Sequence, residues 1–308
     1  MKIVLAGAYG NLGGDIFQAL LKAGHQVVAA DMIQRDLGLT GDYTFKKLDV
    51  TRPEMLKGLC DGADAVISTV GLTKTSATLT NYDIDYQGNL NLLNEAKAAG
   101  VKKFIYISVL KADKAPKVPM LHAKYLMEEE LKKSGLEYII YRPTGYFYDI
   151  IKVFRPMIEK GEVTLLGKKP VSANVIHTPD FAEYIVTHLE DVNKTVSIGG
   201  METYTYEELA KMCFAAAGKP PVIKYAPPFL FDVLAFVNKC KKNGKEAIIR
   251  FSKWTLSESM VADVCYGSHS FKQYIQDSFK KKGEWIYGLG ISVDLGRGVC
   301  GAMRRGIL

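Results

Sequence analysis

The fold is decided by residues 1–13, which read MKIVLAGAYGNLG, and by the pattern that follows them. The apolar run 2–6 predicts a buried strand, and the apolar residues beyond the glycines recur at helical spacing. Between strand and helix, the glycines allow a tight turn, close approach of the backbone to a diphosphate, and close helix packing. The free N–H groups at the helix start then face the phosphates. We therefore predict a dinucleotide-binding loop whose contacts are Gly7, Tyr9, Gly10, Asn11, Leu12 and Gly13.

An acidic residue follows the second predicted strand. Asp31 comes directly after the run 26–30, eighteen residues beyond Gly13. There its carboxylate can accept two hydrogen bonds from the adenosine ribose hydroxyls and would repel a 2′-phosphate. This favours NAD over NADP as the cofactor. Arg35 lies within reach of the same place and would reverse the preference by pairing with a 2′-phosphate, so that alternative stays open.

The first half of the chain alternates between short apolar strands and amphipathic helices. Such alternation is typical of a parallel sheet covered on both faces. We predict an α/β fold, a Rossmann-type doubly wound parallel sheet, with residues 1–142 as the dinucleotide-binding core. The further strands are expected at 43–48, 65–68, 103–107 and 138–141, and the helices near 52–60, 82–99 and 120–134.

The second half, residues 143–308, loses this alternation and contains many prolines. It is expected to form a smaller, mostly helical C-terminal substrate region. Within it, residues 171–200 are predicted to return to the main sheet, as strands at 171–176 and 195–198 on either side of a helix at 180–190. Thr178 is the predicted N-cap of that helix, with Pro179 in its first turn. The tail 284–308 shows no pattern that can be assigned.

Composition places the chain among globular proteins. It has 308 residues, 48% of them hydrophobic, and no apolar run of the roughly 18 residues that a membrane span needs. A core strand at the very start predicts that there is no signal peptide. The five cysteines are scattered, without the close pairs of metal sites. We expect reduced thiols, a cytoplasmic protein and no metal site.

The net charge of +7 is concentrated in the segment 239–253 and near the C-terminus. One interpretation is a solvated basic surface. The other is peripheral contact with an acidic membrane, because this segment follows the apolar run 229–237. Nucleic acid is not an expected partner, since no aromatic residues interleave with the basic ones. The expected ligand is an apolar small molecule, and the sequence leaves a monomer and a homodimer equally open.

Two further strand ends carry candidate cofactor contacts. Asp49, followed by Val50, ends the third strand, where its carboxylate either meets the adenine amino group or caps the next turn. Val70 and Gly71 follow the fourth strand and are expected to run along the cofactor, with the glycine permitting close backbone approach.

Three motifs beyond the glycine loop make a family resemblance specific: YQGNLNLL at 86–93, IYIS at 105–108 and YRPTG at 141–145. Together with the loop, they resemble an extended or atypical short-chain dehydrogenase/reductase of the NmrA-like and epimerase-like branch, over about residues 1–215. The second half, with SIGG at 197–200 and YTYEEL at 204–209, is similar to divinyl-chlorophyllide-reductase-type members. Those enzymes use a nicotinamide cofactor to reduce a carbon–carbon double bond on a large apolar ring.

The resemblance implies catalytic roles. It makes Ser108 the residue that polarises the substrate, Lys124 the lysine that holds the nicotinamide ribose, and Pro143 a further cofactor contact. The family's proton-donating tyrosine lies four residues before the lysine, and here that position is Met120. Substitute donors are Tyr146, which we take as the candidate, and two residues beside the lysine, His122 and Tyr125.

The sequence therefore predicts an NAD(P)-dependent oxidoreductase that passes a hydride between nicotinamide and an apolar, ring-containing carbonyl or alkene. Met120 keeps a second hypothesis open, a non-catalytic NAD(P)-binding redox sensor or assembly protein of the NmrA-like type. A third, a sugar-nucleotide epimerase or dehydratase, would require a tyrosine at position 120.

Overall fold

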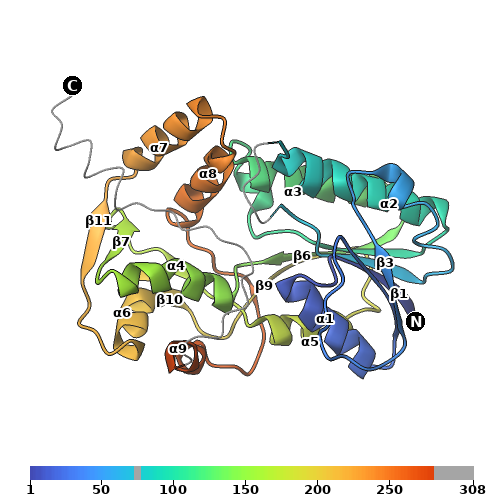
Figure 1. Ribbon diagram of the computed structural model, residues 1–308, viewed down its shortest axis with the longest axis horizontal. Coiled ribbons are helices and arrows are strands. Elements are labelled where there is room, and N and C mark those ends of the chain that lie inside the picture. Colours follow the sequence, from blue (N-terminus) through green and yellow to red (C-terminus); the bar gives the residue numbers. More distant parts are fainter. Residues whose placement is uncertain (73–77, 281–308) are drawn as a thin grey trace.

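The computed structural model describes residues 1–72 and 78–280, and within them one parallel sheet of eight strands forms the centre of the molecule (Figure 1). Its strands are β1 (Lys2–Ala6), β2 (Gln26–Asp31), β3 (Tyr43–Lys47), β4 (Ala65–Ser68), β5 (Lys103–Ile107), β6 (Glu137–Pro143), β9 (Lys194–Gly199) and β12 (Val264–Cys265). Their spatial order is β12-β9-β6-β5-β4-β1-β2-β3. This confirms the predicted Rossmann-type doubly wound fold.

The central strands are buried on both faces. This explains why β1 and β5 read as unbroken apolar runs rather than as alternating ones. The strand order reverses at β1, which pairs with β2 on one side and with β4 on the other. Ligands of doubly wound sheets bind outside the carboxyl ends of the strands at such a reversal. Here that place is the edge where β1 leads into the glycine loop and β4 leads into Thr69.

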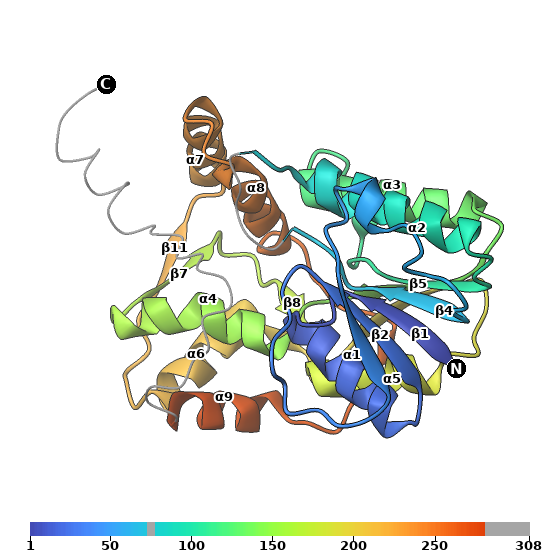
Figure 2. The same cartoon turned by 45° about the vertical axis from the view of Figure 1, so that its right-hand side comes forward.

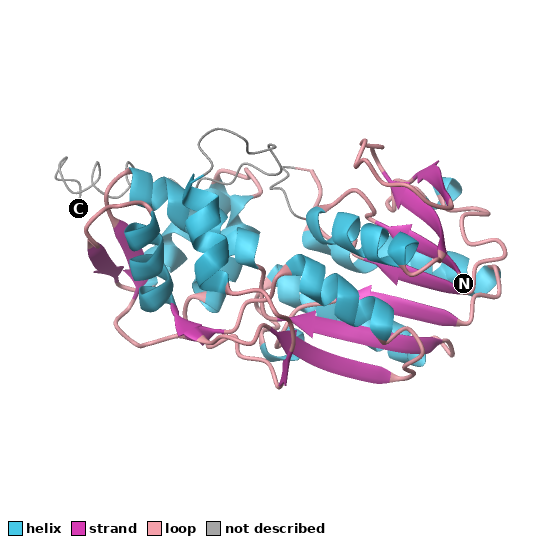
Figure 3. Ribbon diagram, turned by 90° about the horizontal axis from the view of Figure 1, so that it is seen from below, coloured by secondary structure: helices cyan, strands magenta, loops and turns pink. Residues whose placement is uncertain are grey.

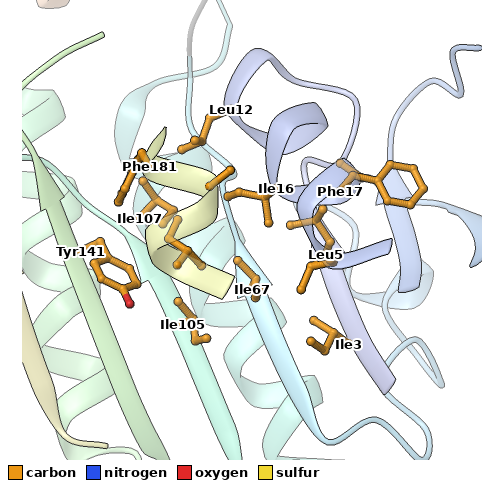
Figure 4. Close-up of a cluster of buried hydrophobic side chains, with 14 of the residues drawn as sticks. Ile3, Leu5, Leu12, Ile16, Phe17, Ile67, Ile105, Ile107, Tyr141 and Phe181 are labelled. Carbon is orange, nitrogen blue, oxygen red and sulfur yellow. The ribbon is translucent and has the colours of Figure 1, made fainter. Parts of the chain in front are cut away.

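Helices cover the two faces of the sheet (Figures 1 and 2). On one face, α1 (Asn11–Lys22) packs beside α5 (Thr178–Thr187), and Figure 4 shows their Ile16, Phe17 and Phe181 over Leu5 and Ile67 of the sheet. On the other face lie a π-helical turn, η2 (Tyr82–Gly88), then α2 (Asn89–Ala98) and α3 (Pro119–Lys133). The predicted helices at 82–99 and 120–134 are thereby confirmed, although the π-helical start was not foreseen.

A second group of helices lies beyond one end of the sheet (Figure 3). There α4 (Phe147–Glu159), α6 (Tyr206–Ala216) and α9 (Phe271–Lys280) share an apolar core, and α7 (Phe229–Cys240) pairs with α8 (Lys245–Thr255). Two small sheets belong to this region. They are formed by β7 (Val163–Leu166) with β11 (Ile223–Ala226), and by β8 (Ser172–Ala173) with β10 (Tyr204–Thr205).

The predicted helix at 52–60 is wrong. Only a 3₁₀ turn, η1 (Pro53–Met55), forms, followed by further turns; a second 3₁₀ turn is η3 (Ala112–Lys114). The reason lies at Gly58, whose φ of +75° is left-handed and whose N–H donates to Glu95 Oε1 at 2.7 Å. A right-handed helix cannot continue through that backbone conformation.

The predicted main-sheet strand at 171–176 is also wrong, whereas the one at 195–198 is confirmed as part of β9. β9 takes the place beside β6, and β12, which the sequence analysis did not predict, takes the next one. Within residues 171–176 the structure forms only the two-residue strand β8, which pairs with β10 instead of joining the main sheet. The following helix, α5, begins earlier than predicted, because His177 stands at the N-cap and Thr178 is the first helical residue.

The remaining composition-based expectations concern cysteines and the membrane. Four cysteines are free thiols, two of them buried (Cys60, Cys213) and two exposed (Cys240, Cys265), while Cys300 lies outside the described residues. The unassigned tail 284–308 lies outside them too. Among the described helices, none combines the length and the hydrophobicity needed to cross a membrane.

Gly13 gives a sharp test of how closely α1 must approach β1. A Cβ added at position 13 would lie 1.9 Å from the carbonyl oxygen of Gly7, whereas one added at the next position, 14, would meet only Leu37 Cδ1, at 3.7 Å. Gly13→Ala should therefore lower the free energy of unfolding by about 3 kcal/mol, as overpacking does. Gly14→Ala should instead raise it by about 0.5–1 kcal/mol, as alanine does inside a helix. Urea unfolding measures both, and equal effects of the two substitutions would contradict this packing.

Candidate functional site

The glycine loop and the acid after β2 are joined directly. The backbone N–H of Tyr9 donates to Asp31 Oδ2 at 2.9 Å, and the N–H of Met32 donates to Asp31 Oδ1 at 2.7 Å. The ring of Tyr9 packs edge-on against Phe17 and Phe45, which holds the loop in place. Each carboxylate oxygen has a second lone pair, so Asp31 can accept from these amides and from two hydroxyl groups at once.

The start of α1 suits an anion. Its N-cap is Gly10, which has no side chain to cap the helix, and Leu12 is buried while Asn11 is exposed. No side chain of the N-cap residue therefore engages the first-turn N–H groups, and Gly7, with φ +82°, turns the chain at the end of β1. The side chain of Asn11 also hydrogen-bonds to Tyr148 of α4. These features fit the diphosphate of a dinucleotide, which the loop and the α1 amides would hold.

The end of β4 is fixed by one buried amide. Ser68 Oγ donates to Asn89 Oδ1 at 2.5 Å, and Asn89 Nδ2 donates to the carbonyl of Val70 at 3.3 Å. After β3, the outermost strand on this side of the sheet, Asp49 Oδ1 accepts from both the N–H and the hydroxyl of Thr51. Val50 packs against Gly88. In this structure Asp49 thus caps the turn after β3, which is the second of the two roles considered for it.

A buried ion pair lies at this edge of the sheet. The ammonium of Lys124, on α3, is 3.2 Å from Asp85 Oδ1 and donates to the carbonyl of Ile107 at 3.2 Å. The side chain of Asp85 is 1% exposed and that of Lys124 is 13% exposed. A Cβ added at Gly71 would lie 2.8 Å from Asp85 Oδ1 and 3.4 Å from Lys124 Nζ. The structure therefore brings Lys124 together with Gly71, as the predicted cofactor path requires.

Asp85 was not singled out from the sequence, although it organises this part of the site. Its Oδ2 accepts from Asn81 Nδ2 at 2.9 Å and from the N–H of Leu72 at 3.2 Å, and its carbonyl accepts from the hydroxyl of Tyr106 at 3.2 Å. It lies in the π-helical turn η2, and such turns are frequent at functional sites. One sequence feature could have revealed Asp85. It lies seven residues before Leu92 and so on the same face of the predicted helix, and Leu92 is buried.

Ser108 is held by a second buried network. Its hydroxyl donates to Glu128 Oε1 at 2.5 Å, and Glu128 is fully buried. Arg142 donates to both oxygens of Glu128 and, through its remaining nitrogen, to Asp113 at 3.1 Å. The only proton of the Ser108 hydroxyl is thus engaged by a carboxylate, so the structure gives it a protein partner where the resemblance implied a substrate.

Tyr146 lies in an aromatic cluster at the N-terminus of α4, just after the buried Pro143. Its ring stacks on Tyr148 at 5.4 Å and on Phe181 at 6.4 Å between centroids. Burial raises the pKa of Tyr146 well above its usual value, so the phenol keeps its proton. Asp149 lies in the first helical turn and is exposed to solvent. Its carboxyl group is an additional acid at this edge that the sequence analysis did not single out.

The position of the family's proton-donating tyrosine holds a methionine in this chain, and a methionine has no proton to donate. Met120 packs, partly buried, against a small apolar cluster under α8. The neighbouring candidate His122 is engaged elsewhere, since its Nδ1 lies 3.0 Å from the hydroxyl of Tyr82.

The basic segment after α7 is partly neutralised. Lys253 lies 2.7 Å from both carboxylate oxygens of Asp232, and Arg250 lies 2.9 Å from Glu246 Oε1. The lysines at the end of α7, in the turn that follows and at the start of α8 are exposed, namely Lys239, Lys241, Lys242 and Lys245.

The family model for NAD(P)H-binding proteins matches residues 7–192, which span the glycine loop, the Lys124–Asp85 pair and Tyr146. The chain belongs to this family. Photosystem II assembly factor Ycf39 of Synechocystis sp. is 27% identical over 265 residues, covering 84% of this chain and 77% of that protein. Divinyl chlorophyllide a 8-vinyl-reductase of Arabidopsis thaliana is 26% identical over 264 residues, covering 75% of this chain and 61% of that protein.

Solved structures share the fold. The NADPH-dependent quinone oxidoreductase of Escherichia coli, complexed with NADPH, has a TM-score of 0.65 at 19% identity, over 90% of this chain and 99% of that one. At this identity the likeness shows the fold alone. Together with the family match, these relatives confirm the resemblance to atypical short-chain dehydrogenases/reductases and the NAD(P)-binding character of the family.

The Ser108–Glu128–Arg142 network predicts a measurable stability effect. Glu128→Gln removes a buried charge and leaves Arg142 partly unpaired, so the free energy of unfolding should fall by about 3 kcal/mol. Glu129→Gln is the matched control, because Glu129 is partly exposed and, among residues 1–72 and 78–280, pairs only with Lys132 on the same helix. That substitution should cost less than about 0.5 kcal/mol. Denaturant titration of both variants tests this, and a Glu128→Gln variant as stable as the control would refute the assignment.

Proposed function

We propose that the protein is an NAD(P)-dependent oxidoreductase that transfers a hydride between nicotinamide and an apolar, ring-containing carbonyl or alkene. The observation that carries the proposal is the buried Lys124–Asp85 ion pair beside Gly71. Burying two charges is costly unless they are well paired, so a cation kept at the carboxyl edge of a dinucleotide-binding sheet favours a role in binding or chemistry.

The residues of this chain would bind and orient the reactants. The glycine loop and α1 would hold the diphosphate, and Asp31 the adenosine ribose. Lys124 would donate to hydroxyl groups of the nicotinamide ribose, with Asp85 and the Ile107 carbonyl fixing its direction. A bound reduced nicotinamide supplies the hydride.

The proton needed with the hydride would come from the cluster at the start of α4. We propose Tyr146 as the donor, because it stands where the chain leaves β6 for α4, at the carboxyl edge of the sheet. Burial raises its pKa, which keeps the phenol protonated at rest but makes it a weaker acid. Ser108 could polarise a substrate only after its hydroxyl leaves Glu128. We therefore assign substrate polarisation to the nearby tyrosine, Tyr146, and a positioning role to Ser108.

We propose NAD rather than NADP as the cofactor, because the Asp31 carboxylate would repel a 2′-phosphate. Asp31→Ala should weaken NADH binding and bring the affinities for NADH and NADPH closer together. Asp42→Ala is the control, since Asp42 precedes β3 at the opposite edge of the sheet, where its carboxylate accepts from the side chain of Gln26. Fluorescence titration with each dinucleotide measures the ratio. An NADH-to-NADPH affinity ratio unchanged by Asp31→Ala would sink the assignment.

Turnover is tested by NADH oxidation with quinones, enones and ring alkenes as acceptors. Lys124→Ala should lower turnover or cofactor affinity at least about tenfold, roughly 1.4 kcal/mol. Lys132→Ala, on the exposed side of the same helix, should leave both unchanged. If neither quantity changes in Lys124→Ala, the lysine has no place in the site. If no acceptor oxidises NADH with the unaltered protein, the enzyme proposal fails.

The second candidate is a dinucleotide-binding assembly protein that turns nothing over. Met120 and the engaged hydroxyl of Ser108 favour it, and so does an exposed apolar face on α7. On that helix, Phe229 is 60% exposed and Phe236 is 65% exposed. Together with the neighbouring exposed lysines, this face would contact a partner protein or the acidic membrane proposed from the basic segment. Tight NADH binding without oxidation by any acceptor would favour this candidate.

A further inference from the structure

A cluster of two imidazoles and a carboxylate lies at the start of α5, against the segment that leads into α9. His177 stands at the N-cap of α5, Asp180 lies in its first turn, and His269 belongs to the segment before α9. The candidate donor atoms of all three residues lie within 4.8 Å of one another. Two of the residues are 92 positions apart in the sequence, which is why no metal site was expected from the sequence.

Several contacts hold the three side chains of the cluster together. The Asp180 side chain is 5% exposed, and its Oδ1 lies 2.7 Å from His269 Nδ1. The rings of His177 and His269 lie 4.4 Å apart, centroid to centroid. Gly267, with φ +120°, lets the chain cross directly over the carboxylate, since a Cβ there would lie 2.4 Å from Asp180 Oδ2. The loop is therefore shaped around Asp180.

One donor atom in the cluster lacks a partner. In the part of the chain that the structure describes, His177 Nδ1 is buried and makes no hydrogen bond. The ring is fixed by packing against Phe147 and Tyr274, so it cannot readily turn to water. A buried polar atom without a partner costs stability, and a ligand for that nitrogen removes the cost.

We propose that His177, Asp180 and His269 form a site for a divalent transition-metal ion, with zinc as the ion to be tested. Two imidazoles and one carboxylate are a donor set that zinc accepts, with water in the fourth position. Donor atoms around one tetrahedral zinc ion lie about 3.4 Å apart. The His269 side chain is 54% exposed, so it is the ligand that would rotate to close the spacing around the fixed His177 ring. The ion would displace the proton shared between His269 and Asp180.

The site would tie the start of α5 to the segment leading into α9. Helix α9 packs on α4 and α6, and its Phe271 lies 4.6 Å from the ring of Phe147. A bound ion would thus stabilise the helical region beyond the sheet. The proposal is independent of hydride transfer, since none of the three ligands belongs to the candidate cofactor site.

The test is a calorimetric titration of the chelator-treated full chain with zinc, together with cobalt as a spectroscopic probe. One ion per chain should bind, with a visible cobalt band of tetrahedral type. His269→Ala and His177→Phe should each weaken binding at least about tenfold, roughly 1.4 kcal/mol. His188→Ala, which removes a histidine stacked on Tyr184 at the other end of α5, should bind as the unaltered protein does.

Stability provides a second readout. His177→Phe keeps the aromatic packing and removes the unpaired nitrogen, so it should fold at least as well as the unaltered protein without metal. Zinc should raise the unfolding temperature of the unaltered protein but not that of either variant. Circular dichroism identifies a variant that has lost its fold, and the other variant then decides. No zinc binding by the unaltered protein, or undiminished binding in the folded variants, would overturn the proposal.

Discussion

The close approach of helix α1 to strand β1 is the constraint on which the rest of the structure depends. Only a hydrogen atom fits between position 13 and the carbonyl oxygen of Gly7. Because the helix starts this close to the end of β1, its first N–H groups lie at the carboxyl edge of the sheet, where the strand order reverses. The same loop donates its Tyr9 amide to Asp31, so the end of β2 and the start of α1 form one surface. A longer turn would separate the two groups.

Across this edge, the buried charges are distributed over two networks with different consequences. Lys124 and Asp85 lie beside Gly71, where a bound dinucleotide could pass close to the main chain. Glu128 and Arg142 instead engage Ser108 and Asp113 beneath the strand ends, where they fix the structure. A buried cation thus lies at the edge proposed for the cofactor, whereas the Ser108 hydroxyl is bonded to a carboxylate within the protein.

The sequence predicted the parts of the fold that local patterns control. The glycine loop, the unbroken apolar strands and the amphipathic helices each carry their signal within a few neighbouring residues. The helix at 52–60 failed because one left-handed glycine outweighed the apolar periodicity. The strand at 171–176 failed because its place beside β6 is decided by competition with β9, which lies later in the chain. In the site, Asp31 was predicted from its position after β2 and Lys124 from the family resemblance. Asp85 and Glu128 were missed because their pairing with Lys124, 39 residues from Asp85, and with Arg142 has no local sequence pattern.

The central claim is that the glycine loop, Asp31 and Lys124 form one nicotinamide-dinucleotide site. Calorimetric titration of the unaltered protein with NADH and with NADPH tests it most directly, because it requires no knowledge of the substrate. The account predicts one site per chain, with NADH bound more tightly than NADPH. Absence of binding by either dinucleotide would contradict it.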